Sequence, residues 1–117
     1  MSEKRKYRSV IFYKEYFESF FLKQNQKVKD KIIWTLNLIE EIQFIPETYL
    51  KHLEGTEGIY EIRVQQASNI FRILCFFDEV KLIVLANAFQ KKTQKTPKNE
   101  LEKALRLMNE YYQEKNK

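Results

Sequence analysis

The sequence has few of the residues on which metal sites and disulfides depend. Its 117 residues include one cysteine, Cys75, and one histidine, His52. A single cysteine cannot form an internal disulfide, and this pair cannot complete a zinc tetrad. Cys75 lies between Leu74 and Phe76 in an apolar run, which is typical of a buried, unreactive thiol. We therefore expect neither a metal ion nor another cofactor in the chemistry of this protein.

Long apolar runs and linker-like stretches are also missing. No apolar segment approaches the roughly 20 residues that span a bilayer, and the basic start at residues 1–6 is not followed by the apolar part of a signal peptide. No stretch rich in Gly, Pro or Ser divides the chain, which is too short for two full cores. We expect one domain over residues 1–117, no membrane partner and a cytoplasmic location.

The chain does contain enough apolar material for a packed core, together with an excess of positive charge. Hydrophobic residues make up 44% and aromatic residues 15%, and the formal net charge is +5. This charge favours polyanionic partners but does not choose among RNA, DNA and a membrane surface. Basic residues concentrate at both ends of the chain: Lys4, Arg5, Lys6 and Arg8 near the start, and Lys91, Lys92, Lys95 and Lys98 near the end.

In the first part of the chain, the pattern predicts one strand and two helices. β-Branched and aromatic residues favour a strand over 7–13. Apolar residues at helical spacing then predict a short helix from Lys14 and a second helix over about 27–43, joined into a helical hairpin by a polar turn. We expect Ile33 and Trp34 to widen the buried face of the second helix.

The rest of the chain predicts strands and a last helix. The two glycines, Gly55 and Gly58, mark a turn, and three strand-like segments follow as an antiparallel meander over residues 59–64, 70–77 and 80–89. Thr96 and Pro97 predict a helix start capped by the threonine hydroxyl. The expected fold is α+β: an N-terminal strand and a helical hairpin packed on a curved antiparallel sheet, with a C-terminal helix.

Charged residues interrupt the predicted strands. Alternation places Glu61 and Arg63 on one face of their strand, and Arg72 breaks an otherwise apolar strand beside it. Burying an isolated ion is costly, so Arg72 must either pair with Glu61 or open into a wet cleft. The lysines of residues 91–98 follow the last strand, which would hold them at a fixed edge. We expect these cations to converge on one surface able to recognise phosphate.

Four segments, in their order and spacing, resemble the RelE/HigB family of bacterial toxins, especially its phage-derived branch. The resemblance runs from about Tyr7 to Tyr112. It implies a RelE-like fold and a toxin of a type II toxin–antitoxin system that enters the ribosome and cleaves messenger RNA without a metal. It also implies a partner antitoxin with a HigA-like helix-turn-helix domain. The segments are Leu53-Glu54-Gly55, Ile59-Tyr60-Glu61-Ile62-Arg63-Val64, Phe71-Arg72-Ile73-Leu74 and Phe89-Gln90-Lys91-Lys92-Thr93-Gln94-Lys95-Thr96-Pro97.

The resemblance also implies roles for individual residues. Arg72 matches the family's strand arginine, and its planar fork can grip a phosphate. Arg63 matches a neighbouring basic position, with a salt bridge to Glu61 as the structural alternative. The resemblance implies a catalytic or RNA-gripping role for Lys91 and Lys92, attraction of the RNA backbone by Lys95, and assistance by Lys98 at the helix start. Phe89 either stacks on a base or packs in the core. Lys51 and His52 either contact RNA or are simply exposed to solvent.

The sequence does not identify the general acid and the general base, because the last strand ends in Asn87, Ala88 and Phe89 where several relatives have a histidine or tyrosine. Glu61 is the candidate base, with a purely structural role as the alternative. Two other functions also remain: a ParE-like toxin that acts on DNA gyrase, and a non-catalytic RNA-binding module. An intact cluster of cations favours the nuclease, because a gyrase poison needs no phosphate site on that face.

Overall fold

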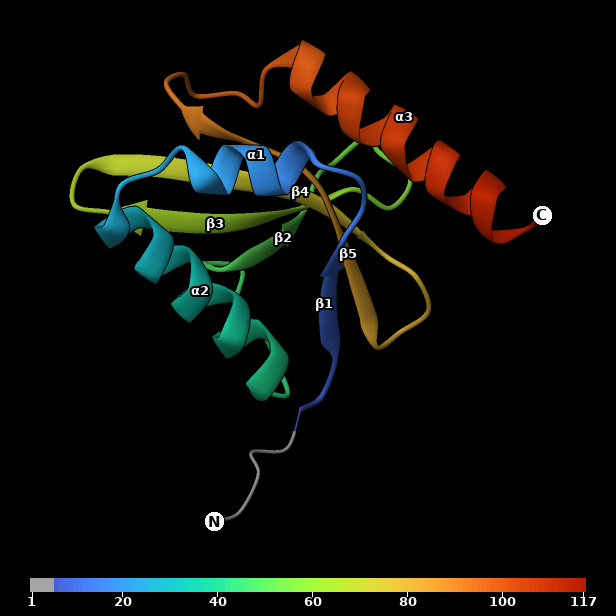
Figure 1. Cartoon of the computed structure of the whole chain (residues 1–117), viewed down its shortest axis with the longest axis horizontal. Coiled ribbons are helices and arrows are strands. Elements are labelled where there is room, and N and C mark those ends of the chain that lie inside the picture. Colours follow the sequence, from blue (N-terminus) through green and yellow to red (C-terminus); the bar gives the residue numbers. More distant parts are fainter. Residues whose placement is uncertain (1–5) are drawn as a thin grey trace.

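The structure is a computed structural model that describes residues 6–117, so Lys4 and Arg5 of the N-terminal basic group lie outside the described residues. The helices and strands follow one another in the order that the sequence predicts, with one additional short strand, β2 (Figure 1). The elements are β1 (Ser9–Phe12), α1 (Tyr16–Leu22), α2 (Gln26–Glu41), β2 (Leu50–His52), β3 (Tyr60–Gln66), β4 (Asn69–Phe77), β5 (Leu82–Lys91) and α3 (Lys98–Lys115).

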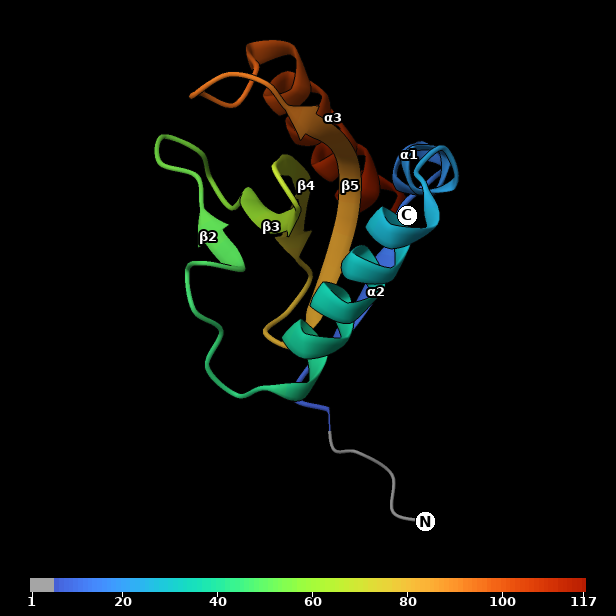
Figure 2. The same ribbon diagram turned by 90° about the vertical axis from the view of Figure 1, so that its left-hand side faces the viewer.

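The strands form one sheet in the order β1-β5-β4-β3-β2. β3, β4 and β5 are the predicted antiparallel meander, and β2 adds to the free edge of β3. β1 pairs in parallel with β5, so the N-terminal strand joins the antiparallel meander as a parallel edge strand and the whole sheet is mixed. Parallel pairing is possible here because a long connection, not a hairpin, joins β1 to β5. Figure 2 shows how strongly the sheet curves.

Helices cover both faces of the sheet. α1 and α2 lie together on one face (Figures 1 and 2) and enclose a core in which Ile32 and Ile39 of α2 are buried with Ile62 and Ile73 of the sheet. α3 packs on the other face through Ala104 and Leu107, against a cluster that includes Leu74, Phe76, Val84 and Phe89. Cys75 is fully buried in the first core, as its apolar setting predicts.

Two expectations about the helices were wrong. Ile33 and Trp34 are 46% and 47% exposed, because they follow Ile32 by one and two residues and turn away from its buried face. The N-cap of α3 is Pro97, and it has no side-chain cap. The hydroxyl of Thr96 instead lies 3.5 Å from Oε2 of Glu61.

Arg8, from the N-terminal basic group, has a structural partner. Its guanidinium donates hydrogen bonds to the carbonyl oxygens of Ile39, Ile42 and Gln43, at 2.5, 2.8 and 2.7 Å. These carbonyls lie at the C-terminal end of α2, where they lack partners within the helix and attract a cation. Arg8 therefore joins the N-terminal segment to α2.

A β-bulge in β5 decides which side chains point towards α3. The pairs Ile73–Ala88 and Cys75–Leu85 leave one residue of β4 opposite two residues of β5, Ala86 and Asn87. The extra residue shifts the alternation, so Phe89 lies on the α3 face together with Ala86. Asn87 anchors the bulge by donating to the backbone oxygen of Glu100 at 3.1 Å and to its side chain at 2.9 Å.

Among residues 6–117, no helix is both long enough and apolar enough to cross a membrane.

Candidate functional site

The candidate site is built around two arginines on neighbouring strands. Arg63 of β3 and Arg72 of β4 are direct partners in the antiparallel ladder, so their side chains leave the sheet on the same side. Glu61 lies two residues before Arg63 and shares this side. It is the side that α3 covers further along the sheet, as shown by Leu74 and Phe76 in the α3 core.

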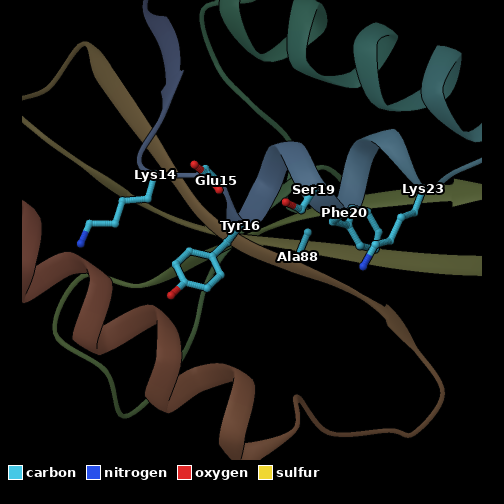
Figure 3. Close-up of a pocket in the computed structure, with 7 residues that line it drawn as sticks. All are labelled: Lys14, Glu15, Tyr16, Ser19, Phe20, Lys23 and Ala88. Carbon is cyan, nitrogen blue, oxygen red and sulfur yellow. The ribbon is translucent and has the colours of Figure 1, made fainter.

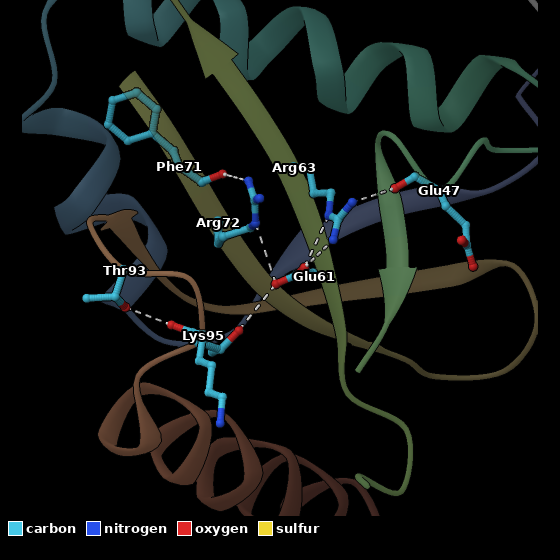
Figure 4. A network of polar contacts seen from close by, with 8 residues as sticks. Glu47, Glu61, Arg63, Phe71, Arg72, Thr93 and Lys95 are labelled. Atoms are coloured by element: carbon cyan, nitrogen blue, oxygen red, sulfur yellow. Dashed lines mark hydrogen bonds and ion pairs between the residues drawn. The ribbon is translucent and has the colours of Figure 1, made fainter. Parts of the chain in front are cut away.

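Glu61 is buried and contacts both arginines, as Figure 4 shows. Its Oε1 lies 3.1 Å from both Nε and Nη2 of Arg63, and its Oε2 lies 3.6 Å from Nε of Arg72. The Thr96 hydroxyl completes the surroundings of Oε2. The salt bridge that the sequence offered as the structural alternative for Arg63 is therefore present, and Arg72 shares the same carboxylate.

Arg72 is the more enclosed of the two arginines. Its side chain is 10% exposed, against 30% for Arg63, and its Nη1 donates to the backbone oxygen of Phe71 at 3.2 Å. Burial lowers the pKa of Arg72, and the positive charge of Arg63 adds to this effect while Glu61 opposes it. Both arginines also line a cleft of about 340 Å³. Arg72 thus both pairs with Glu61 and borders an open cleft.

Two lysines add to the positive charge around this pair. β2 places Lys51 opposite Glu61, and the ladder between β4 and β5 places Lys91 opposite Ile70, two residues before Arg72. The pKa of Lys91 is lowered by burial first and then by the charges of Arg72, Arg63 and Lys51, against an opposite effect of Glu61. We call Lys51, Glu61, Arg63, Arg72 and Lys91 the basic cluster.

The remaining lysines of the C-terminal run lie outside this cluster. Lys91 is the last residue of β5, whereas Lys92 and Lys95 lie in the exposed loop before α3 and Lys98 begins that helix. The side chain of Lys95 extends away from Glu61 in Figure 4. The run is therefore split between one partly buried lysine at the end of β5 and three exposed lysines beside it.

Two predicted RNA contacts do not join the cluster. Phe89 is 8% exposed, and its ring packs in the α3 core. His52 is exposed and lies next to Lys51 in β2, so its side chain leaves the opposite side of the sheet. Its ring lies against Tyr60, and its Nε2 is 3.1 Å from the Thr56 oxygen.

Sequence reasoning missed the contributions of β2 and Thr96. The sequence pattern predicts no strand around Lys51, although Leu50, Lys51 and His52 form one that pairs with β3. The alternation of buried Leu50 with Lys51 is the local signal that was available. Nothing local indicates that Thr96 reaches Glu61, because the contact spans 35 positions of the sequence.

A larger cavity, of about 630 Å³, lies elsewhere and contains no residue of the basic cluster. Figure 3 shows that its lining comes from α1 and the residues next to its two ends, with Tyr16 directed towards α3, and that β5 contributes Ala88. Lys14 at its edge is paired with Glu110 at 3.1 Å, and Lys103 lies over the ring of Tyr16. Lys14, one of the two lysines that line this cavity, therefore already has an ion-pair partner on α3.

The basic cluster can bind a phosphate group and stabilise negative charge that develops on it. Two guanidinium groups contact a single carboxylate, and two lysines leave the sheet on the same side beside them. Preorganised cations of this kind act most strongly where water is partly excluded. Within the described residues, no group of three His, Cys, Asp or Glu side chains is placed to hold a metal ion.

Comparison with known proteins gives one family. Residues 19–109 match the family described as "Phage derived protein Gp49-like (DUF891)". The matched region covers well over half of the chain and includes every residue of the basic cluster. No curated protein gives a significant match to the sequence.

Proposed function

Because this chain belongs to the Gp49-like family of phage-derived proteins, a toxin-like family of RelE/HigB type, we propose that it is a toxin that cleaves messenger RNA on the ribosome. In this proposal it is a HigB-like member of a type II toxin–antitoxin system. Its partners are the ribosome with bound messenger RNA, and an antitoxin with a HigA-like helix-turn-helix domain. It acts without a metal and in the cytoplasm, as one domain over residues 1–117.

The observation that carries this proposal is the arrangement of Arg63 and Arg72 around one shared carboxylate. Cleavage by attack of a ribose 2′-hydroxyl on the adjacent phosphorus requires three things. The hydroxyl must lose its proton, the negative charge of the phosphorane must be stabilised, and the leaving 5′-oxygen must gain a proton. Two fixed guanidinium groups beside a cleft meet the second requirement directly.

We assign Glu61 to the first requirement, the removal of the proton from the 2′-hydroxyl. In the structure its Oε1 accepts a hydrogen bond from Nε of Arg63, and its Oε2 lies 3.6 Å from Nε of Arg72 and 3.5 Å from the Thr96 hydroxyl. A substrate phosphate gripped by both arginines would replace Glu61 as their partner. The released carboxylate would then accept the proton of the 2′-hydroxyl. Glu61 thus holds the arginines in the free protein and becomes the base when RNA binds.

We assign Lys91 to the third requirement, the protonation of the leaving 5′-oxygen. Its pKa is lowered by burial and by neighbouring cations, and a lowered pKa makes a lysine a better proton donor near neutral pH. It has no ion-pair partner among residues 6–117. Protonated Lys91 would therefore give its proton to the leaving 5′-oxygen. Lys92, Lys95 and Lys98 are exposed nearby and would attract the RNA backbone over a longer range.

The test is to add the wild type, Arg72→Ala and Arg72→Lys to a translation extract and to map messenger 5′ ends. Wild-type protein should cut only translated messenger. Arg72→Ala should lower the cleavage rate by about 10²–10³-fold, the usual cost of removing one charge-stabilising donor. Arg72→Lys should recover little, since an ammonium group lacks the planar fork.

Arg106→Ala is the matched control, because Arg106 is an exposed arginine on α3 that pairs only with Glu110 of the same helix. It should cleave like the wild type. Intact messenger together with stalled gyrase would replace the proposal with a ParE-like activity. RNA binding without cleavage would replace it with a binding module.

A further inference from the structure

We propose that a groove at the C-terminal half of α3 binds a segment of the antitoxin that carries apolar side chains flanked by lysine or arginine. The inference rests on the proposed function, because it takes the antitoxin as the partner. The groove has a volume of about 620 Å³ and lies between α3, the start of β3 and the turn that joins β4 to β5. We call it the α3 groove.

The walls of the α3 groove are apolar and open to solvent. Phe77 of β4 and Met108 and Tyr112 of α3 line it, and Val80 in the adjoining turn is 84% exposed. The sequence pattern placed Val80 inside a strand, but β5 begins only at Leu82. An exposed apolar side chain beside an apolar groove is a typical feature of a protein-binding surface.

The charge at the rim indicates what kind of partner fits. Glu57 and Glu79 line the groove and are exposed, and neither makes an ion pair within the described residues. The protein as a whole carries a net charge of +5, so this acidic rim contrasts with the basic cluster. It would repel an RNA backbone and attract lysine or arginine, which makes a basic, apolar peptide the complementary occupant.

The groove is held in shape by polar contacts between α3 and the β4–β5 turn. Tyr112 donates a hydrogen bond to the Phe77 oxygen at 2.5 Å, and Asp78 accepts one from Tyr111 at 2.6 Å. Lys115 adds an ion pair with Asp78 at 2.6 Å. A preformed groove loses less conformational entropy on binding than one that must first be ordered.

The α3 groove is separate from the basic cluster. No residue lines both the groove and the cleft beside Arg63 and Arg72, and Met108 lies ten positions along α3 from Lys98, about 15 Å at the usual helical rise. A partner held here need not touch the residues proposed for catalysis. Variants of the groove should therefore separate antitoxin binding from RNA cleavage.

The first experiment uses Val80→Lys and the double variant Glu57→Lys/Glu79→Lys. Each is tested against the antitoxin encoded by the reading frame that adjoins the toxin gene, with affinity measured by calorimetry and cleavage measured in a translation extract. Both variants should bind the antitoxin at least 10-fold more weakly than the wild type and should cleave messenger equally well. Phe44→Lys is the matched control, because Phe44 is 83% exposed but lies outside the groove, and it should bind normally.

Unchanged antitoxin affinity in folded Val80→Lys, with thermal unfolding like that of the wild type, would overturn the inference. So would a dimer of this chain that Val80→Lys dissociates in sedimentation experiments, because the occupant would then be a second copy. The proposed function fails separately: a wild type that never cuts messenger but loses its antitoxin through Val80→Lys would leave the groove assignment standing.

A second experiment tests the chemistry of the groove without any antitoxin. Two synthetic peptides, acetyl-Lys-Leu-Phe-Lys-amide and acetyl-Glu-Leu-Phe-Glu-amide, are titrated into the protein while the methyl signals of Val80 and Met108 are followed by NMR. The basic peptide should shift both signals at concentrations at least 10-fold lower than the acidic peptide. Equal shifts by both peptides, or shifts by neither, would contradict the charge preference.

Discussion

Arg63 on β3 and Arg72 on β4 lie directly opposite each other, and the same carboxylate contacts both. Like charges at directly opposed positions of a sheet destabilise it, and Arg72 is also almost buried. Glu61 offsets this repulsion in the free protein. In the proposed mechanism, a substrate phosphate takes the place that the Glu61 carboxylate occupies between these two cations.

The first prediction concerns this carboxylate. Glu61→Gln preserves the size of the side chain but removes its charge, which leaves the two arginines facing each other without compensation. We expect the free energy of unfolding to fall by about 1–3 kcal/mol, the usual cost of an uncompensated buried polar group, as measured by urea denaturation. Cleavage should be lost, whereas binding to an RNA with a 2′-deoxy substitution at the cut site should be kept or strengthened.

Glu54→Gln serves as the control, because Glu54 is exposed in the turn between β2 and β3. It should change neither stability nor cleavage. A Glu61→Gln protein that cleaves at the wild-type rate would rule out the base assignment, and weaker RNA binding would contradict the exchange of Glu61 for phosphate.

The second prediction concerns the pH dependence of cleavage. The folded protein lowers the pKa of Lys91 below its ordinary value of 10.5, and the proposed acid must be protonated. The cleavage rate should therefore fall as pH rises through this lowered pKa. Lys91→Arg should move that alkaline limb to higher pH and slow the reaction, because arginine keeps its proton. Lys92→Arg, the control, should leave the profile unchanged.

The same shift has a consequence for stability. The unfolded chain holds the Lys91 proton more tightly than the folded chain does, so the contribution of this residue to stability should rise as pH increases from its folded pKa towards 10.5. A Lys91→Met variant should lack this rise in urea denaturation. An alkaline limb that is identical in wild type and Lys91→Arg would exclude Lys91 as the proton donor.

The third prediction separates structure from RNA binding at the N-terminal basic group. Arg8→Met removes the donors to three carbonyl oxygens at the end of α2. Stability should fall by about 1.5–3 kcal/mol, as expected for hydrogen bonds to a charged group, while cleavage per folded molecule stays unchanged. Lys6→Met removes a more exposed ion pair with Glu40 and should have a much smaller effect. A selective loss of cleavage in Arg8→Met would assign Arg8 to RNA binding.

The fourth prediction concerns the contact between Asp78 and the end of α3. Hydrogen bonds from Lys115 and Tyr111 lower the pKa of Asp78. The stability that this carboxylate contributes should be present above its unfolded value of about 3.8 and be lost as pH falls through the lower folded value. The stability difference between wild type and Lys115→Met should therefore be large near neutral pH and vanish in acid.

Tyr111 provides a second measurement of the same contact. Its hydrogen bond to Asp78 raises the pKa of its hydroxyl to about 12. Asp78→Asn should lower this value towards that of an ordinary tyrosine, visible as earlier phenolate absorbance on alkaline titration, with Tyr111→Phe used to identify the signal. An unchanged titration in Asp78→Asn would show that the contact does not persist in solution.

Much of the fold follows from local pattern. The alternation around Glu61 and Arg63 correctly predicts a strand with both charges on one side, and helical spacing correctly predicts a buried face at Ile32 and Ile39. The failures also have local causes. Ile33 was assigned to the core by its apolar side chain alone, although its angular position on α2 turns it outwards.

The composition and order of the chain were enough to predict an α+β fold, a central meander and a pair of strand arginines near a carboxylate. Tertiary structure decided which other cations join them. β2 brings Lys51 opposite Glu61, and the bulge at Ala86 and Asn87 shifts the alternation of β5 so that Lys91 lies on the α3 face. Both depend on pairing between distant segments, and the periodicity of a single strand carries no information about its partner's register.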